Sequence, residues 1–363
     1  MRDYLSLRDY DWPMFLVVLA ICGLGVTQIY SATHGTVWHD SWWKQIIYIG
    51  AGIFLMWAVS LIDYHTMMNH LTPLYLLAVG GLLAVLLVGK TVFNSTRWIA
   101  LPGGIHIQVS EFAKLVIILV VARFMTELRS EVLELPELLK ISGLLLVPML
   151  LIAKEPDLST AVTYVPILGV GIFLAGLRWQ YWTAFAILFL LVVPLSFSLL
   201  KPYQKDRLVI FLNPDTDPKG TGYQIRQSKI AVGSGGMWGR GVTKGTQTQL
   251  RFLPVAHTDF IFSAFSEENG FVGVMAALAF YFVLLMQIVQ NAQTAPDRAG
   301  MFICMGVAAL LLFHILVNVG MVVGRMPVSG IPLPLMSYGG SSIWSTFLML
   351  GLVNNVRLRR FVN

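Results

Sequence analysis

Long apolar runs constrain the fold of this chain more than any other feature of its sequence. A transmembrane helix needs roughly 20 predominantly apolar residues, and ten segments of about this length occur among the 363 residues. Only 12% of the residues are charged, whereas soluble domains carry about 25%. We therefore predict an all-α polytopic membrane protein with about ten transmembrane helices, at approximately 13–31, 44–62, 71–89, 108–125, 138–153, 158–177, 180–200, 269–290, 299–323 and 341–356.

Two of these segments carry further expectations. The fifth is short and contains Pro148, so we expect its helix to be broken or to reach the membrane edge through its flanks. The first is long enough to span the membrane and follows a start that mixes acids with bases, unlike a cleaved signal peptide. We therefore expect it to remain as the first span.

The positions of the basic residues predict the orientation of the helices, because cytoplasmic loops carry an excess of Lys and Arg. With the N-terminus inside, the short inner segments hold ten basic residues, namely Arg2, Arg8, Arg123, Arg129, Lys140, Arg178, Arg298, Arg357, Arg359 and Arg360. The short outer segments hold five, namely Lys44, Lys90, Arg97, Lys154 and Arg325. Both termini are therefore predicted to be cytoplasmic. The net charge of +6 reflects these membrane edges and one long loop, so no nucleic-acid partner is predicted.

That long loop spans 201–268, between the seventh and eighth predicted helices, and faces outward in this topology. It is the only large module within a single membrane domain of residues 1–363. A loop of this length is usually functional or disordered. Its glycine turns alternate with apolar stretches at 225–230 and 250–253, which we expect to pack back onto the membrane surface; a flexible connector is the alternative.

Asp259 is the most informative carboxylate near the outer side. It lies in the run HTDFIFSAF, between a polar loop and aromatic residues, where a lower dielectric raises a carboxyl pKa toward values useful to a general base. An Asp directly before an apolar helix can equally serve as its N-cap. By contrast, Asp215 and Asp217 lie in NPDTDPKG, which is typical of a turn. We expect most of the ten carboxylates that can face the outer side to be solvated. They are Asp40, Glu111, Glu155, Asp157, Asp206, Asp215, Asp217, Asp259, Glu267 and Glu268.

Residues 267–270, with the sequence EENG, interrupt the apolar run that follows Asp259. An unbroken helix over 258–289 would be about 48 Å long, which exceeds the roughly 30 Å of the hydrocarbon core. We therefore expect these residues to mark the membrane edge or a helix break. A solvated acidic cluster at this point is favoured over a direct role.

Several charged residues lie near the outer ends of the predicted helices. Glu111 and Lys114 share one helical face and are expected to pair or to contact a ligand headgroup, with snorkelling as the alternative. Lys154, Glu155 and Asp157 lie in a connection so short that it must stay near the membrane surface. The remaining candidates for binding an anionic, phosphate-bearing lipid are Arg97, Trp98 and the loop bases Arg207, Arg226, Lys229, Arg240, Lys244 and Arg251. The alternatives are an interface anchor for the tryptophan and a merely solvated basic loop.

Five stretches resemble the SEDS family of membrane proteins, and most closely its RodA branch. They are TRW at 96–98, SEFAKL at 110–115, EPDLSTA at 155–161, the loop from NPDTDPKG through GTQTQ to HTDFIF, and PLPLMSYGGSS at 332–342. The resemblance implies a ten-helix enzyme of the bacterial cytoplasmic membrane that polymerises lipid II outside the membrane for cell elongation. It also implies a class B penicillin-binding protein and other elongation-complex membrane proteins as partners. The amino-acid sequence of the long loop favours RodA over its division relative FtsW.

The resemblance also assigns candidate roles. The essential family aspartate falls on Asp259, and the matched motifs add Gln247, His257, Thr258 and Ser337 as candidate substrate-binding residues beside those named above. The family more often has Gln where this chain has Glu155, so an individual role for Glu155 is doubtful. The implied chemistry is inverting transfer, in which Asp259 deprotonates the acceptor hydroxyl while undecaprenyl pyrophosphate leaves, stabilised by Arg97, Lys114 or loop arginines. A divalent cation, Mg or Mn, is possible, although no ligand cluster in the sequence establishes one.

Two other functions stay open on the sequence alone. A lipid II flippase would place polar groups through the membrane depth, whereas ionisable residues here gather at the predicted outer edge. A non-catalytic scaffold for the crosslinking partner would not need Asp259. The sequence contains no H-E-x-x-H, no P-loop and no G-x-S-x-G in a strand-turn-helix context, which argues against ATP-driven transport and serine hydrolysis.

Overall fold

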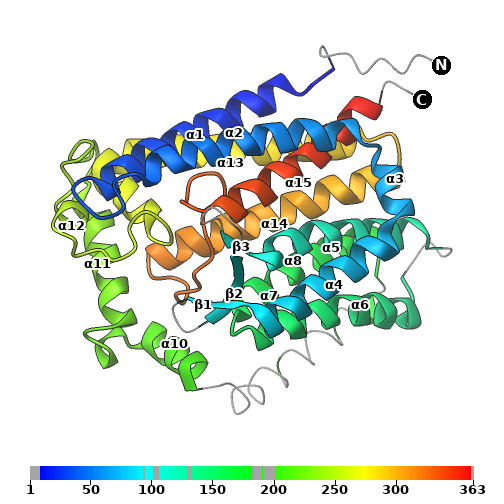
Figure 1. The fold of residues 1–363 in the computed structure, drawn as a ribbon, viewed down its shortest axis with the longest axis horizontal. Coiled ribbons are helices and arrows are strands. Elements are labelled where there is room, and N and C mark those ends of the chain that lie inside the picture. The colour runs from blue at the N-terminus through cyan, green and yellow to red at the C-terminus, as the bar shows by residue number, and fades with distance from the viewer. Residues whose placement is uncertain are drawn as a thin grey trace.

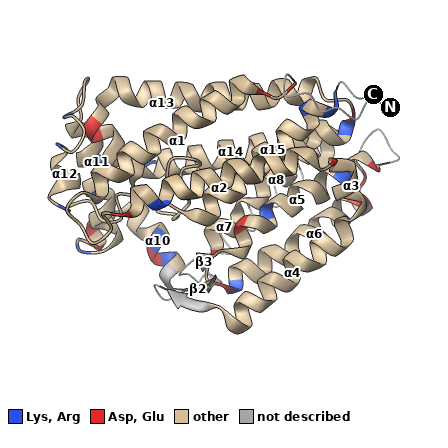
Figure 2. Ribbon diagram, turned by 45° about the horizontal axis from the view of Figure 1, so that its top comes forward, with Lys and Arg blue, Asp and Glu red and all other residues tan. Residues whose placement is uncertain are grey.

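The chain folds into a bundle of long helices that run roughly along one direction (Figure 1). The computed structural model describes residues 9–92, 95–100, 106–128, 133–177, 179–181, 183, 190 and 202–360. In Figure 1 the two termini lie together at one end of the bundle, and α10, α11 and α12 lie at the opposite end. Most of the length of the helices is free of charged residues, which gather toward the ends (Figure 2).

Seven of the described helical segments are long and apolar enough to cross a membrane. They are α1 (Trp12–Thr33), α2 (Ser41–Leu61), α4 (Leu71–Val88), α6 (Leu135–Lys154), the segment Leu158–Ala175 formed by α7 (Leu158–Val162) and α8 (Tyr164–Ala175), α13 (Ile261–Gln293) and α14 (Arg298–Val322). Each coincides with a predicted span. The prediction of a multi-pass, mainly helical membrane protein is confirmed.

The other three predicted spans have different outcomes. α5 (Val109–Thr126) and α15 (Gly340–Arg359) cover the fourth and tenth. Both are largely buried and carry polar side chains inside the bundle, such as Glu111 on α5 and Asn354 on α15. The seventh, 180–200, lies almost entirely outside the described residues, so the count of ten stays a prediction.

The fifth span is continuous through Pro148. α6 begins at Leu135, three residues before the predicted start, and ends at Lys154. A capping box formed by Glu134 and Glu137 starts the helix, because each side chain accepts a hydrogen bond from an otherwise unpaired backbone N–H group. The flanks therefore supply the missing length, and the helix is not broken at the proline.

The expectation of a purely helical chain is wrong at the connection between α4 and α5. Strands β1 (Lys90–Val92), β2 (Ser95–Ala100) and β3 (His106–Ile107) form a three-stranded antiparallel sheet in the order β1-β2-β3. Ile99 pairs with Ile107. The sheet places Arg97 and Trp98 of β2 beside the bundle, and β3 leads directly into α5.

The predicted outer loop contains ordered elements rather than forming only a flexible connector. They are α10 (Pro202–Leu212), the 3-10 turn η1 (Pro214–Thr216), α11 (Thr221–Ser234) and α12 (Thr246–Gln249). α11 packs on α13 and α14, where the Ser228 hydroxyl lies 2.8 Å from the Ser263 hydroxyl and donates to the Val322 carbonyl. Of the two apolar stretches expected to pack back, Ile225 and Leu253 are buried, whereas Ile230, Leu250 and Phe252 are exposed.

α13 contains the expected break. Gly270 has φ 64° and ψ −168° in the middle of the helix, a conformation that favours glycine. A Cβ atom at Gly270 would lie 2.2 Å from the Gly239 nitrogen, so the glycine also allows residues 237–239 to approach the helix. The break divides a 33-residue helix that would otherwise be about 50 Å long.

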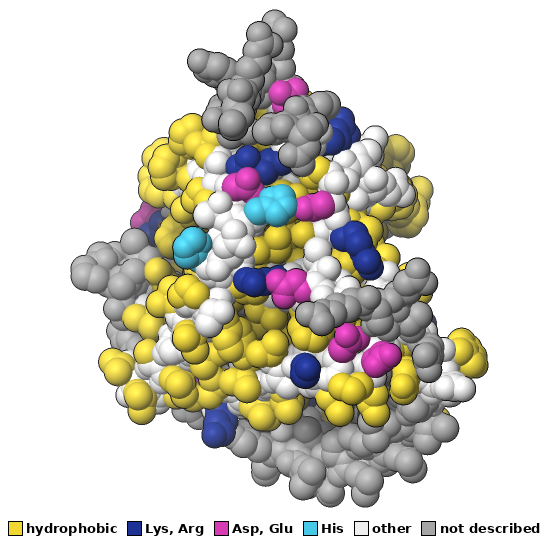
Figure 3. Space-filling view, turned by 90° about the vertical axis from the view of Figure 1, so that its right-hand side faces the viewer, with side chains coloured by type: hydrophobic (Ala, Val, Ile, Leu, Met, Phe, Trp, Pro, Cys, Tyr) yellow, Lys and Arg dark blue, Asp and Glu magenta, His cyan; other side chains and the backbone are white. Residues whose placement is uncertain are grey.

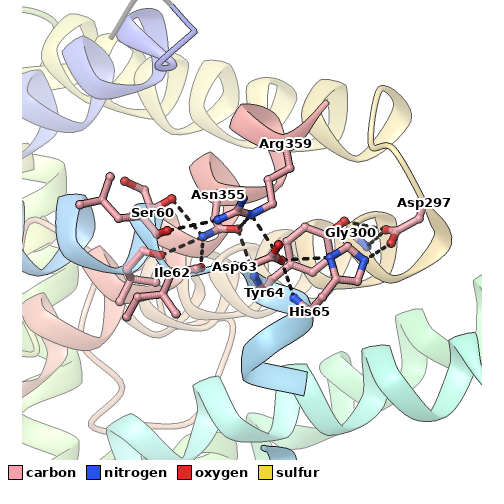
Figure 4. Close-up of polar contacts among 11 residues, drawn as sticks. Ser60, Ile62, Asp63, Tyr64, His65, Asp297, Gly300, Asn355 and Arg359 are labelled. Carbon is pink, nitrogen blue, oxygen red and sulfur yellow. Dashed lines mark hydrogen bonds and ion pairs between the residues drawn. The ribbon is translucent and has the colours of Figure 1, made fainter. Parts of the chain in front are cut away.

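The end that carries the termini is held together by a polar cluster. Figure 3 shows acidic, basic and histidine side chains set among hydrophobic ones on this end. In Figure 4 His65 of α3 (Tyr64–Asn69) lies between Asp63 and Asp297, at 3.0 and 2.7 Å. Arg359 of α15 lies 3.3 Å from Asp63. The cluster therefore joins α3, the α13–α14 connection and α15, all predicted to be cytoplasmic.

Candidate active site

Asp259 lies in the stretch that leads into α13, at the end of the bundle away from the termini. The N-cap of α13 is Phe260, and no side chain caps it. The alternative reading of Asp259 as a helix cap is therefore wrong. Its carboxylate stands 3.7 Å from where a Cβ of Gly330 would lie, so a glycine in the facing segment leaves room beside it.

The backbone around Asp259 is fixed by hydrogen bonds from distant segments. The amide of Asn318, on α14, donates to the Asp259 carbonyl at 3.1 Å and to the Ile331 carbonyl at 2.9 Å. The Ser337 hydroxyl donates to the Thr258 carbonyl at 2.8 Å. These bonds hold the carboxylate on a rigid support, which a catalytic group requires.

Two arginines act on the Asp259 side chain. Burial raises the pKa of this carboxyl above its ordinary value, while the positive charges of Arg207 and Arg97 lower it. Arg207 lies on α10 and Arg97 on β2, so two elements far apart in sequence bring cations to the same acid. The charges of two predicted site residues thus act on a third, and the net direction of the pKa is upward.

Arg97 is held in place by the connection between α6 and α7. Its guanidinium lies 3.6 Å from Asp157 and donates to the backbone carbonyls of Glu155 and Pro156. Asp157 is buried and also accepts a hydrogen bond from Gln108 at 3.2 Å. Asp157 therefore helps to orient the Arg97 guanidinium.

Glu155 occupies the same connection but has a different character. Its side chain is only 1% exposed, and neither carboxylate oxygen has a hydrogen-bond partner among the described residues. Burial and the nearby Asp157 raise the pKa of Glu155 to about 8, against the opposing charge of Arg97. A neutral carboxyl resembles the glutamine that the resemblance to the SEDS family implies at this position, so a glutamate is compatible with the site.

The predicted pairing of Glu111 and Lys114 is confirmed. Their charged atoms lie 2.7 Å apart, and both side chains are buried. Ser345 of α15 donates to the second oxygen of Glu111 at 3.0 Å. The pair satisfies both charges inside the bundle, where α5 meets α15, so snorkelling to the membrane surface is excluded.

The remaining predicted residues divide by position. Ser337 and Thr258 support the Asp259 stretch through backbone carbonyls, as described above. His257 precedes it, with its ring 5.7 Å from Trp38 and 5.8 Å from Tyr338; burial lowers the pKa of His257. Trp98 is half-buried beside Arg97.

Two lysines do not join this site in the part of the chain that the structure describes. Lys154 is exposed at the end of α6. Lys229 is exposed on α11, where its chain lies against Gly324. Of the three charged residues at the connection between α6 and α7, only Asp157 forms an ion pair with Arg97.

The expectation of a solvated cluster at residues 267–270 is wrong. Glu267 and Glu268 are 0% and 1% exposed. The Glu267 carboxylate accepts hydrogen bonds from the backbone of Gln247 and from the backbone and hydroxyl of Thr248, at 2.8 to 3.2 Å. Gln247 therefore contributes its backbone N–H here, and the glutamate fixes the segment around α12.

Glu268 connects the same region to α1. It accepts hydrogen bonds from the Ser31 hydroxyl at 2.5 Å and the Gln28 amide at 3.2 Å. Five of the ten predicted outer carboxylates are in fact buried, namely Glu111, Glu155, Asp157, Glu267 and Glu268. For Glu267 and Glu268 the sequence did hold a signal of burial, because two adjacent acids inside an apolar run are too costly unless other groups pair with them.

A sequence model of the FtsW/RodA/SpoVE family, described as cell cycle proteins, matches residues 12–360. The chain belongs to this family. Similar full-length members include a peptidoglycan glycosyltransferase RodA from Treponema pallidum, 33% identical over 98% of this chain and 99% of that protein. Another is the peptidoglycan glycosyltransferase MrdB from Escherichia coli K12, 37% identical over 96% of this chain and 94% of the relative.

Two solved structures have the same fold as this chain. One, from work on how a peptidoglycan synthase complex coordinates polymerization and crosslinking, gives a TM-score of 0.85 at 30% identity, covering 98% of this chain and 99% of its own. The rod shape determining protein RodA of Thermus thermophilus gives 0.72 at 28% identity, covering 97% and 98%.

The described part of the chain offers no ready-made site for a divalent cation. Among the residues that the structure describes, no group of three or more His, Cys, Asp or Glu side chains is placed to hold a metal ion. The Mg or Mn ion raised by the sequence therefore stays a prediction, and the chemistry below does not depend on it.

Proposed function

We propose that Asp259 is the general base with which this chain joins lipid II units into β-1,4-linked glycan strands. The chain is a peptidoglycan glycosyltransferase, as are its full-length relatives, and its role in cell elongation follows the RodA branch. The observation that carries the proposal is a half-buried carboxyl of raised pKa, on a rigid stretch, acted on by two arginines from separate elements.

The proposed step is a single displacement with inversion. The 4-hydroxyl of the acceptor sugar attacks the anomeric carbon of the donor, and its proton passes to an Asp259 oxygen. The bond from that carbon to the pyrophosphate oxygen breaks, and undecaprenyl pyrophosphate leaves with the electron pair. A base whose pKa is raised toward the working pH is well matched to this transfer.

Arg97 and Arg207 are the proposed stabilisers of the departing pyrophosphate. Guanidinium groups form forked hydrogen bonds with phosphate oxygens, and fixed charges stabilise a developing anion without the cost of reorganising. Asp157 and the carbonyls of residues 155 and 156 already hold Arg97 in one orientation. Lys114, by contrast, is already paired with Glu111 and is the weaker candidate.

The arrangement of the chain supports a site outside the bacterial cytoplasmic membrane, with both termini inside. Asp259, Arg97, Arg207 and Asp157 come from segments predicted to be outer, while the cluster around His65 comes from predicted inner ones. We propose lipid II as the substrate and a class B penicillin-binding protein as the partner, with other elongation-complex membrane proteins. A related structure is described as part of a synthase complex that coordinates polymerization and crosslinking.

Polymerisation from purified lipid II separates this proposal from a flippase or a non-catalytic scaffold. The protein and its cognate penicillin-binding partner, with crosslinking blocked by a β-lactam, should yield glycan chains that a muramidase specific for β-1,4 bonds degrades. Lipid II movement across vesicles without polymer would favour the flippase. The absence of both polymer and lipid II movement would favour the scaffold.

A further inference from the structure

A groove with no role in the step above lies beside the Asp259 stretch. It has a volume of about 270 Å³ and lies between the α1–α2 connection and the residues that follow α12. Its lining includes Thr36, Trp38, Thr248, Arg251 and His257. Aromatic, hydroxyl and cationic side chains thus meet in one depression, a mixture typical of ligand sites.

Trp38 presents an aromatic surface to this groove. Its side chain is 52% exposed, and its ring contacts that of His257, which in turn contacts Tyr338. The face of an aromatic ring carries partial negative charge, so it attracts the slightly positive C–H hydrogens on one face of a pyranose ring. An exposed tryptophan supported by further rings therefore suits a sugar.

Arg251 supplies polar recognition at the same place. One of its nitrogens donates to the Gly35 carbonyl at 2.6 Å, and a guanidinium has five N–H donors, so donors remain for acetamido and carboxylate oxygens. Arg251 and Val255 have φ of 61° and 52°, which is uncommon for residues with a side chain. Such strain persists where surrounding structure imposes it and clusters at ligand sites.

The groove is rigidly connected to the proposed base. His257 lies two residues before Asp259, so their Cα atoms are at most about 7 Å apart. The Tyr338 N–H donates to the His257 carbonyl at 3.0 Å, and the bonds from Ser337 and Asn318 fix the next two residues. A ligand in the groove is therefore held at a constant distance from the reacting groups.

We propose that this groove binds saccharide units of the glycan strand next to the point of synthesis. The inference rests on the proposed function, because only an enzyme that retains a polymer needs a sugar site beyond its donor and acceptor. Stacking on Trp38 and hydrogen bonds from Arg251 slow the release of the strand between additions. The groove therefore sets product length rather than the rate of each bond-forming step.

The test compares Trp38→Ala with Trp238→Ala, whose side chain is 80% exposed in the α11–α12 connection, outside the groove. Lipid II is polymerised with the β-lactam-blocked partner, and product lengths are resolved on gels. We expect Trp38→Ala to shorten products several-fold while lipid II consumption in the first turnovers changes less than about threefold. Trp38→Phe should restore length, and Trp238→Ala should leave both unchanged.

A second measurement does not depend on activity. Binding of a lipid-free tetrasaccharide of alternating N-acetylglucosamine and N-acetylmuramic acid is followed by saturation-transfer NMR, and Trp38→Ala should weaken it at least tenfold. Unchanged tetrasaccharide binding and unchanged product length in Trp38→Ala would overturn the proposal that the groove binds saccharide units. So would a loss of thermal stability with normal product length, which would make Trp38 a membrane-interface anchor. If Trp38→Ala does not fold, Trp38→Leu gives the same comparison.

The two proposals fail separately. A wild-type protein that makes no polymer contradicts the proposed function. Its tetrasaccharide binding, compared with that of Trp38→Ala, still tests whether the groove is a saccharide site.

Discussion

Burial and positive charge act on the Asp259 side chain in opposite directions. Burial alone raises its pKa, and Arg207 and Arg97 restrain that rise. The position of Asp259 before an aromatic run was sufficient to predict a candidate base from the sequence. Its two arginine neighbours were not predictable as a group, because their approach depends on how α10 and β2 pack at the end of the bundle.

Arg207→Gln should move the acid limb of the pH–rate profile upward. Asp259 must be deprotonated to act as a base, and removing a nearby positive charge raises its pKa further, so a higher pH is needed for the same active fraction. The measurement is lipid II polymerisation across pH 5 to 9 with the partner present. Arg226→Gln, which removes an exposed cation that pairs with Asp215, is the control. An unchanged limb in Arg207→Gln would mean that its charge does not act on the base.

Glu155→Gln should stabilise the protein at neutral pH. The folded pKa of Glu155 is about 8, above its ordinary value of 4.5. Between these values the unfolded chain releases a proton that the folded chain retains, so stability falls as pH rises through this window, by up to about 1.4 kcal/mol per pH unit. Wild type and variant should therefore melt alike near pH 4 and diverge toward pH 8.

Apparent melting temperature in detergent measures this difference. Glu127→Gln, at an exposed ion pair with Arg123, should change little because exposed pairs contribute little. A Glu155→Gln variant less stable than wild type at pH 7 would show that the carboxylate is ionised and bound to a partner.

Among the helices, α13 shows both the strength and the limit of sequence-based prediction. The apolar length of the run and the EENG interruption predict a break near residue 270, and Gly270 makes it. The burial of Glu267 and Glu268 was not predictable. Their partners lie on α1 and around α12, and Ser31 is 237 residues away from Glu268 in the chain. The strands β1 to β3 were also not predictable, because strands of two to six residues in a connection between helices give little periodic signal.

Gly270→Ala should destabilise the junction between α13 and residues 237–239. An added Cβ would meet the Gly239 nitrogen at 2.2 Å and the Trp238 carbonyl carbon at 2.7 Å, and the positive φ is unfavourable for alanine. We expect a loss of several degrees in apparent melting temperature. Gly233→Ala, on α11 with no atom within 4 Å of the added carbon, should be neutral or stabilising by about 0.5–1 kcal/mol. Equal melting of both variants would contradict the close approach.

The molecule as a whole separates two kinds of polar chemistry by a long apolar middle. At one end the cluster around His65 joins elements close to the termini (Figure 4). At the other end Arg207 of α10 and Arg97 of β2 act through their charges on Asp259, which precedes α13, and the α6–α7 connection holds Arg97. Hydropathy and the distribution of basic residues predict this separation well. The ordered helices of residues 202–249 were beyond prediction because glycine-rich loops give a weak helical signal.

The most direct test of the account compares wild type with Asp259→Asn in polymerisation of purified lipid II, with the cognate partner present. Asparagine keeps the shape of the side chain but cannot accept the proton, so the rate should fall by about 10²- to 10⁴-fold, while folding and partner binding are retained. Asp215→Asn, at an exposed position on η1, should polymerise like wild type. Polymer formation by Asp259→Asn at the wild-type rate would contradict the assignment of Asp259 as the base.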